Sequence, residues 1–475
     1  MSLPRPPTSV SSRLFWLARA FFVCLLLAAL ATRPNLPAQP SASPVLLLIP
    51  AGWLTAWLLA RWLEHPRRPW RWGVAGLSRP LAAFSLWAVA SRFLAFRPGP
   101  WPGLGSGGLK AVAAFVLVWL LYLYLVAEGP ALAIPLALVV LVQGVVAILQ
   151  VATQSDLGLW WLGEPALDPS DGGVIVLLVA GQRWLRGYGL TGGPNTLGAS
   201  LALLVIFLLP QLLRGHGRRQ WLWSLAISIG VVGLLASFSR SAVLALGLGL
   251  VAWAGLAWRR GLFPTWPRER WPALALPVVL AAAYLLLHAP AITSRLAPDA
   301  NPLEARSLGE RQRDANLALS IFARRPLVGV GLGNFQAAAQ ALDPTARVVH
   351  NVPLLVMAEL GVIGAAFWVW LALAGLWRGW RSRAQPGWLL GLWLAFLVPS
   401  LFGPWWFTIS WRVGVLFALL LAAGEGETEG RREGGRREGE IERLEIGRLE
   451  IERLGGCSRQ RDHTLHRPPP LTTDH

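Results

Sequence analysis

The residue of this sequence best suited to proton-transfer chemistry is His350, where a long segment with many polar residues meets an apolar run. An imidazole with an unperturbed pKa of about 6.5 accepts a proton at neutral pH, as a general base must. Asn351 is suited to cap a helix through its side-chain oxygen, with Pro353 tolerated in the first turn. Such a helix would direct its positive end toward the same site, where a phosphate binds favourably. The alternative for His350 is an interfacial histidine that merely precedes a helix.

Two arginines at the ends of apolar runs are suited to bind a phosphate-bearing group. Arg186 lies in LRGYGLTGGPN, whose glycines let the backbone approach a ligand closely. Arg240 lies in SFSRSA, a very short turn between two apolar runs. Two guanidinium groups that converge on one side form a diphosphate clamp by bidentate hydrogen bonding. The alternatives are a contact of Arg186 with lipid head groups and an arginine–carboxylate pair that involves Arg240.

Acidic residues give little sign of a metal site. Glu359 lies about two helical turns beyond His350, inside an apolar run. Ionisable groups within a membrane are costly and functional by default, and packing against an arginine is the equally weighted alternative. Asp168 and Asp171 are close in sequence, but no acidic pair has the spacing of metal ligands. We therefore expect no catalytic metal and no cofactor.

The composition indicates the class of protein that must position these residues. Of the 475 residues, 54% are hydrophobic and 14% are charged, with a mean hydropathy of +0.49. Soluble domains contain about 25% charged residues, so this is a membrane protein. The net charge of +18 comes from arginines that recur between hydrophobic runs rather than from one basic domain, which is typical of topology determinants and excludes a nucleic-acid-binding protein.

Twelve apolar runs are candidates for membrane-spanning helices, each of which needs about 20 mostly apolar residues. They are Leu14–Ala31, Pro44–Leu63, Leu77–Phe96, Leu109–Ala127, Ala131–Ala152, Thr196–Leu213, Trp221–Ala236, Ala242–Trp258, Pro272–His288, Val352–Trp377, Trp388–Leu401 and Trp405–Ala422. The sequence therefore predicts an all-α integral membrane protein with about 12 transmembrane helices. Within Thr153–Asn195, the apolar stretch VIVLLV is too short to span, and predicts a strand or an interfacial segment.

Arginines in the short loops predict the orientation, because cytoplasmic loops are enriched in Lys and Arg. The richer set of loops holds Arg67, Arg68, Arg71, Arg79, Arg214, Arg218, Arg219, Arg259, Arg260, Arg268, Arg270, Arg378, Arg381 and Arg383. The opposite set holds Arg33, Arg97, Arg183, Arg186 and Arg240. We therefore expect both termini in the cytoplasm, and Arg186, Arg240 and the segment Ala289–His350 on the outer face.

The predicted organisation follows from these runs. It comprises a cytoplasmic N-terminus at 1–13, spans 1–9 at 14–288, a large extracytoplasmic loop at 289–350, spans 10–12 at 351–422 and a low-complexity cytoplasmic tail at 423–475.

In the large loop, Arg311–Arg325 is expected to form an amphipathic helix near the interface. The following GVGLGNF suits a tight re-entry toward the membrane, and no strand–helix unit of a nucleotide-binding domain surrounds it. The repeat EIERL-EIGRL-EIERL matches neither the helix nor the strand period, so we expect a disordered or weakly helical tail.

Four ordered blocks of the sequence resemble the O-antigen ligase and polymerase superfamily. They are RGYGLTGGPN, SRSA, ARRPLVGVGLGNF and HNVPLLVMAELGVIG, and they extend roughly from Ala180 to Gly364. The resemblance implies a type-C membrane glycosyltransferase that takes a glycan from undecaprenyl diphosphate at the outer leaflet and joins it to an acceptor hydroxyl, without metal or nucleotide.

The resemblance also implies roles for particular residues. His350 matches the histidine that activates or positions the acceptor, and Arg186 and Arg240 match the arginines that hold the diphosphate. Arg311, Asn195 and Glu359 match further positions and, with Asn351 beside the histidine, are expected to bind substrate. The sequence departs from the family pattern where Gly193 replaces a histidine and Ala315 replaces a tryptophan, which leaves the acceptor open.

The expected function is O-antigen ligase-like transfer in the assembly of cell-surface polysaccharide such as lipopolysaccharide, in the cytoplasmic membrane. The expected partners are the undecaprenyl-diphosphate-linked donor, a lipid- or glycan-linked acceptor and membrane lipids, with no nucleic acid. A polymerase of the same superfamily is the nearest alternative, because it shares these blocks. A transporter of the inorganic-carbon type is the alternative from another class, although the sequence shows no internal repeat around midplane charges. A non-catalytic scaffold would leave the two arginines and the histidine with no reason to converge.

Overall fold

The computed structural model describes residues 10–29, 44–64, 77–95, 106–128, 132–261, 268–296, 302–383, 386–403 and 414–423 of the 475-residue chain. The chain divides into two compact units, Met1–Glu425 and Gly426–His475. The second unit lies outside the described residues, and with it almost all of the predicted cytoplasmic tail. The loop with Arg67, Arg68 and Arg71 and the first half of the last predicted span also lie outside them.

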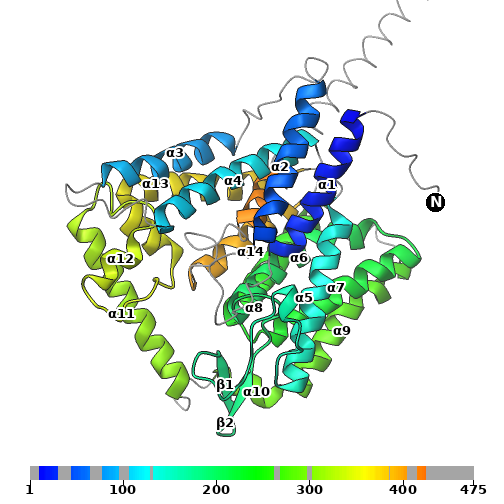
Figure 1. Cartoon of the computed structure of the whole chain (residues 1–475). Helices are drawn as coiled ribbons and strands as arrows, with labels where there is room; N and C mark the ends of the chain where they lie inside the picture. Colours follow the sequence, from blue (N-terminus) through cyan, green and yellow to red (C-terminus); the bar gives the residue numbers. More distant parts are fainter. Residues whose placement is uncertain are drawn as a thin grey trace, which may run out of the picture. The chain divides into compact units, whose positions relative to one another are not determined.

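The first unit is mostly helical (Figure 1), because long apolar runs alternate with short arginine-bearing turns. Each of the twelve predicted runs overlaps a helix in the described part of the chain. The helices are α1 (Val10–Ala29), α2 (Pro44–Glu64), α3 (Ser78–Leu94), α4 (Ser106–Glu128), α5 (Ala133–Thr153), α6 (Pro194–Arg214), α7 (Arg218–Ala236), α8 (Arg240–Arg259), α9 (Trp271–Leu287), α10 (Ala289–Leu296), α11 (Pro302–Arg324), α12 (Phe335–Gln340), α13 (Val352–Arg381) and α14 (Trp388–Ser400). A further apolar helix covers Gly414–Ala423.

Six helices among the described residues are long and apolar enough to cross a membrane. They are α5, α6, α7, α8, α13 and the stretch Arg268–Leu287, which ends in α9. Shorter apolar helices cover Val112–Glu128, Trp388–Ser400 and Gly414–Ala423. The prediction of a helical, multi-pass membrane protein is therefore confirmed. The count of twelve spans, their orientation and the type-C arrangement stay predictions.

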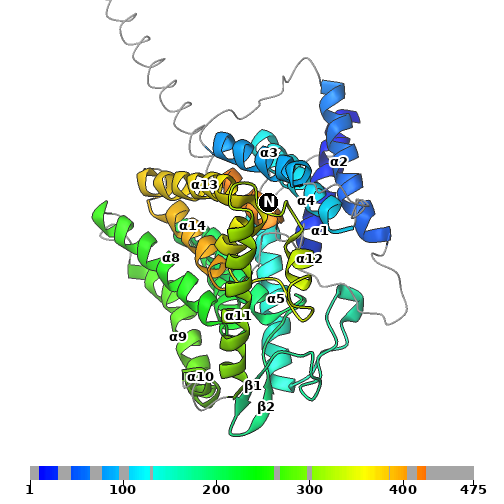
Figure 2. The same cartoon turned by 90° about the vertical axis from the view of Figure 1, so that its left-hand side faces the viewer.

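The helices that frame the candidate site pack through buried apolar faces. Helix α7 contacts α5, α6 and α9, and α8 contacts both α6 and α14. Helix α13 packs on α14 and on α3, while α11 lies against α13 (Figure 2). The segment between α9 and α13 therefore returns to the helices that flank it in sequence.

The structure adds one feature that an all-α description lacks, a two-stranded antiparallel hairpin of β1 (Val176–Val179) and β2 (Gln182–Leu185). The strand alternative for the VIVLLV stretch is thus correct. The turn consists of Ala180 and Gly181, which have φ angles of 50° and 79°, and this pair of positive values matches the twist of a tight hairpin. Strand β1 packs on α10, and β2 leads directly into Arg186.

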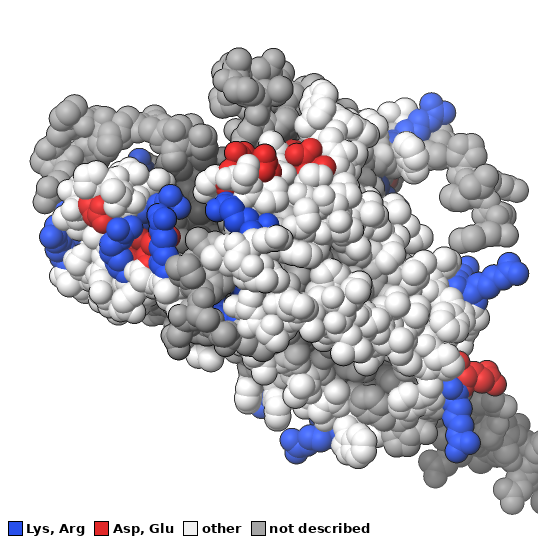
Figure 3. Space-filling view, turned by 90° about the horizontal axis from the view of Figure 1, so that it is seen from below, with Lys and Arg blue, Asp and Glu red and all other residues white. Residues whose placement is uncertain are grey.

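The predicted large loop at 289–350 is itself largely helical, with α10, α11 and α12 in it. The expected helix at Arg311–Arg325 is present as the second half of α11, which begins earlier, at Pro302. Helix α11 carries both arginines and carboxylates. In Figure 3, blue and red side chains intermingle on the left, where α11 lies, whereas the broad centre of the view is white.

The glycine-rich segment after α11 fills a break in α13. Gly361 interrupts that helix with φ 68° and ψ −169°, a backbone conformation that is essentially restricted to glycine. The break frees the carbonyl oxygen of Glu359 to accept the N–H of Gly331 at 2.7 Å, and the N–H of Val362 donates to the Pro326 carbonyl oxygen at 2.7 Å. A side chain at Gly361 would collide with the Leu327 carbonyl group. The glycine-rich segment after α11 therefore packs on α13 through backbone hydrogen bonds.

The substitution Gly361→Ala tests this account of the break. It should lower the free energy of unfolding by on the order of 2–3 kcal/mol, because alanine disfavours this backbone conformation and its Cβ meets the Leu327 carbonyl. The matched control is Gly247→Ala in α8, where nothing lies within 4 Å of the added Cβ. Denaturant unfolding in detergent micelles provides the comparison. Equal stability of the two variants would contradict the docked arrangement.

Candidate active site

Two buried glutamines of α5 hold the segment 186–193 in place. Gln150 Oε1 accepts the backbone N–H groups of Tyr188 and Gly189, each at 2.9 Å, and its Nε2 donates to the carbonyl oxygen of Gly189 at 2.9 Å. Gln143 Oε1 accepts a third backbone N–H of the segment at 2.8 Å. Because the two glutamines are two helical turns apart, they share one face of α5. Polar side chains inside an apolar helix thus fix the backbone next to Arg186.

The guanidinium group of Arg186 is buried among neutral hydrogen-bond partners. Its Nε donates to the carbonyl oxygen of Ser237 at 2.8 Å, and its Nη2 donates to Oδ1 of Asn195 at 2.8 Å. The residue is only 3% exposed. None of the ion pairs seen between described residues involves it. A buried cation that is bound by neutral oxygens keeps its charge available for an anion.

The turn between α7 and α8 gathers two further arginines. Arg240 Nη1 donates to the carbonyl oxygen of Arg295 at 2.9 Å. In return, Nε and Nη2 of Arg295 both lie 3.3 Å from the carbonyl oxygen of Phe238. Phe238 has a left-handed φ of 47°, which makes this turn tight. Consecutive carbonyl groups of one turn therefore hold Arg295 and Arg186.

Four arginines from separate elements act on one another electrostatically at this place. Burial, followed by the charges of Arg311 and Arg240, lowers the pKa of Arg186 to about 10. Burial and the charges of the other three arginines also lower the pKa of Arg295. Burial and Arg240 lower the pKa of Arg311. Guanidinium groups stay protonated at neutral pH, so the arginine cluster (Arg186, Arg240, Arg295 and Arg311) is a concentrated positive charge.

This arrangement agrees with part of the sequence-based expectation. Arg186, Arg240 and Arg311 come together, and Asn195 lies against Arg186. Their binding to substrate stays a prediction. Arg295 was not predicted to take part. The sequence feature that could have revealed it is an arginine in the stretch TSRLAP, shortly after the ninth apolar run.

Helix α11 also contacts His350, through Asp314. Asp314 Oδ2 is 3.4 Å from His350 Nδ1, and the two side chains are 4% and 39% exposed, respectively. Burial, followed by the charge of Arg311, lowers the pKa of His350 below its ordinary value, and Asp314 opposes this shift. The imidazole is therefore neutral at pH 7 and able to accept a proton.

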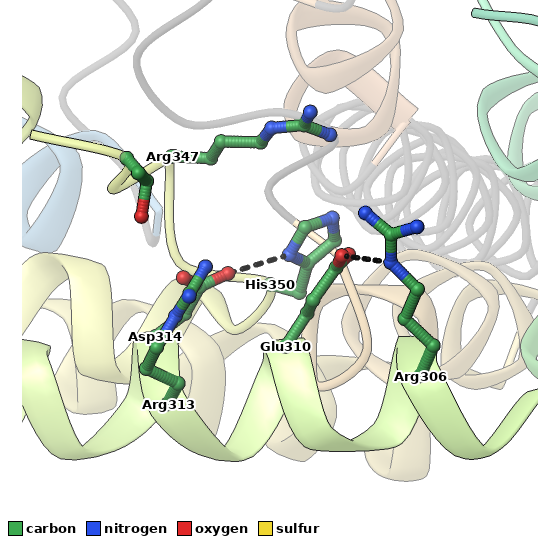
Figure 4. Close-up of a pocket in the computed structure, with 7 residues that line it drawn as sticks. Arg306, Glu310, Arg313, Asp314, Arg347 and His350 are labelled. Atoms are coloured by element: carbon green, nitrogen blue, oxygen red, sulfur yellow. Dashed lines mark hydrogen bonds and ion pairs between the residues drawn. The ribbon is translucent and has the colours of Figure 1, made fainter. Parts of the chain in front are cut away.

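A pocket of about 260 Å³ opens beside His350. Figure 4 shows its charged lining, which includes Arg306, Glu310, Arg313, Asp314, Arg347 and His350. Within it, Arg306 Nε pairs with Glu310 at 3.0 Å. Guanidinium and carboxylate groups offer both donors and acceptors, so the pocket is suited to a ligand with many hydroxyl groups.

Asn351 and Glu359 are occupied by the protein itself. Asn351 Oδ1 caps α13 by accepting the N–H of Leu354 at 2.9 Å, as predicted, and its Nδ2 donates to the Leu401 carbonyl oxygen at 3.0 Å. The buried carboxylate of Glu359 accepts the backbone N–H groups of Gly333 and Phe335, at 2.9 and 3.0 Å. The charge of Arg92 also acts on Glu359, in line with the arginine alternative, whereas the two bonds from backbone amides were not predicted. Contacts of both residues with substrate stay predictions.

No group of three or more His, Cys, Asp and Glu side chains that could hold a metal ion occurs within the described ranges. Asp168 instead accepts hydrogen bonds at 2.7 Å from both the backbone N–H and the hydroxyl of Ser170. Metal independence stays a prediction.

The fold and the site together define a multi-pass helical membrane protein with a cluster of arginines next to a histidine. Residues 223–369 match the family model described as O-antigen ligase. This match supports assignment of the chain to the O-antigen ligase superfamily, and the resemblance noted in the sequence is thereby confirmed. The matched segment contains Arg240, Arg295, Arg311 and His350, whereas Arg186 precedes it. No curated protein matches the chain.

The substitution Gln150→Leu tests how the Arg186 segment is held. It leaves the buried N–H groups of Tyr188 and Gly189 without their acceptor, at a cost of roughly 1–3 kcal/mol for each unsatisfied group. We expect a lower thermal midpoint and faster amide hydrogen exchange in residues 186–193. The control is Gln340→Leu on the exposed face of α12. Unchanged exchange in a Gln150→Leu protein would contradict the anchoring role.

Proposed function

We propose that this protein is a membrane glycosyltransferase that moves a glycan from undecaprenyl diphosphate to an acceptor hydroxyl at the outer leaflet. The observation that carries the proposal is the arginine cluster, placed beside a neutral histidine on a chain that contains an O-antigen ligase domain. A diphosphate is the ligand that such a cluster fits best, because several guanidinium groups can share its oxygens.

The reaction is a substitution at the anomeric carbon of the donor sugar. The acceptor oxygen forms a bond to that carbon while the bond to the diphosphate oxygen breaks, and the departing diphosphate keeps the electron pair. Negative charge on the leaving group therefore grows, and the arginines stabilise it as it does so. Arg186 is pre-positioned for this part, since the Ser237 carbonyl and the Asn195 side chain already fix its guanidinium plane.

His350 takes the proton that the acceptor hydroxyl loses. Its pKa is lowered by burial and by Arg311, so the ring is in the basic form at neutral pH. The polar pocket next to it provides room for the acceptor sugar. As pH falls through the pKa of His350, the ring becomes protonated and transfer is lost.

The acceptor decides between two members of the superfamily. Transfer to a lipid-linked core makes the protein a ligase, and transfer to a growing glycan makes it a polymerase. We favour the ligase, in line with the description of the matching family. The two differ in the product: a ligase adds a preformed chain once, whereas a polymerase gives a ladder of sizes.

The direct test is transfer from a labelled undecaprenyl-diphosphate glycan by the purified protein in bilayers, with EDTA present. Wild-type protein should form product, and His350→Ala should lower the rate by roughly 10²- to 10⁴-fold, the usual contribution of a general base. The control is His216→Ala, an exposed histidine that contacts Arg270, which should retain the wild-type rate. Normal transfer by a folded His350→Ala protein would contradict the mechanism. Absence of product from wild type with every acceptor would contradict a transferase and favour transport.

A further inference from the structure

A buried carboxylate that the proposed mechanism does not use lies next to His350. Asp314, on the inner face of α11, has a side chain that is only 4% exposed. Its one ion-pair contact among the described residues is with His350 Nδ1, at 3.4 Å. Isolated carboxylates are rarely buried without a partner, so the placement of Asp314 calls for a role at this ring.

The two nitrogens of the imidazole ring have different surroundings. Nδ1 is buried and has no well-aligned hydrogen bond, with Asp314 as its nearby carboxylate. Nε2 is directed away from Asp314, on the side where the guanidinium groups of Arg306 and Arg347 lie (Figure 4). One nitrogen therefore faces an anion and the other faces the pocket.

We propose that Asp314 is a positioning residue for His350, which it holds in the tautomer that carries hydrogen on Nδ1. This inference rests on the proposed function, in which His350 is the general base, and it identifies Asp314 as the residue that orients His350. With hydrogen on Nδ1, the lone pair is on Nε2 and points to the pocket. The acceptor hydroxyl gives its proton to Nε2, and Asp314 then stabilises the resulting imidazolium. In other enzymes, too, a carboxylate holds a catalytic imidazole in the required tautomer and stabilises its protonated form.

The other charged groups near the ring do not replace Asp314 in this role. The other carboxylate of the pocket, that of Glu310, is paired with Arg306 at 3.0 Å. The groups that face His350 are Arg306, Glu310, Arg311, Arg313 and Asp314 from α11 and Arg347 from the preceding segment.

Helix α11 thereby connects the two halves of the site. Arg311 and Asp314 are three residues apart, so they lie on one side of the helix. Arg311 adds to the arginine cluster, while Asp314 contacts the base. Helix α11 thus contributes a cation for the diphosphate and also fixes the tautomer of His350, the proton acceptor.

The test combines nitrogen NMR of labelled histidine with transfer kinetics, in the full-length protein in nanodiscs. In wild type, the His350 signal, assigned by its loss in His350→Gln, should show the Nδ1–H tautomer at alkaline pH. Asp314→Asn should reduce that tautomer and lower the pKa of His350, because it removes a negative charge that raises it. It should also lower kcat by at least tenfold, with an unchanged KM for the donor. The control is Asp343→Asn, whose carboxylate lies outside the pocket lining.

The NMR readout is independent of activity, so the two proposals fail separately. An Nε2–H tautomer in wild type would overturn the role of Asp314, even if Asp314→Asn does not fold. An unchanged tautomer and pKa in a folded Asp314→Asn protein would overturn it as well. If wild type transfers no glycan but the tautomer and pKa respond as expected, the positioning of His350 by Asp314 holds and the transferase proposal fails.

Discussion

The site depends on positive charges that are held close together against their own repulsion. Like charges repel one another, and here burial together with the charges of neighbouring arginines lowers the pKa values of Arg186, Arg295 and Arg311. Carbonyl oxygens of the turn at 237–239 hold two of these side chains. The neutral acceptors of Arg186, the Ser237 carbonyl and the Asn195 side chain, fix its guanidinium group without cancelling its charge. We propose that an anionic ligand, the donor diphosphate, relieves this repulsion.

The surrounding helices hold the arginines and His350 in position. Helix α5 fixes the backbone beside Arg186 through Gln143 and Gln150. The break of α13 at Gly361 accommodates the chain that leaves α11, and α11 lies on α13. His350 immediately precedes the capped start of α13. Helix α11 carries Arg311 and contacts His350 through Asp314, so this one helix connects the arginine cluster with the histidine.

Hydropathy and residue type alone predicted the helical membrane class, the helices of the predicted spans, the helix at Arg311 and the cap at Asn351. They also selected His350, Arg186 and Arg240, which lie beside apolar runs on the predicted outer face, whereas Arg311 was selected through the family resemblance. Arg295 and Asp314 escaped notice, since each looks like an ordinary surface residue until α10 and α11 fold back on the bundle. Glu359 was predicted to meet an arginine or a substrate. The charge of Arg92 does act on it, but its hydrogen bonds come from backbone amides of a segment whose docking depends on the break at Gly361. Long-range backbone contacts of that kind leave no periodic pattern in a sequence.

The central claim is that the arginine cluster binds the diphosphate of a polyprenyl donor. The most direct measurement is equilibrium binding of undecaprenyl diphosphate to the purified protein in nanodiscs, with undecaprenol as the uncharged comparison. Arg186→Gln and Arg311→Gln should each weaken binding by at least tenfold, since charge-assisted hydrogen bonds contribute about 1.5–3 kcal/mol. Arg324→Gln, at the exposed end of α11, should leave it unchanged. Equal affinity of all four proteins, or equal binding of undecaprenol, would contradict the account.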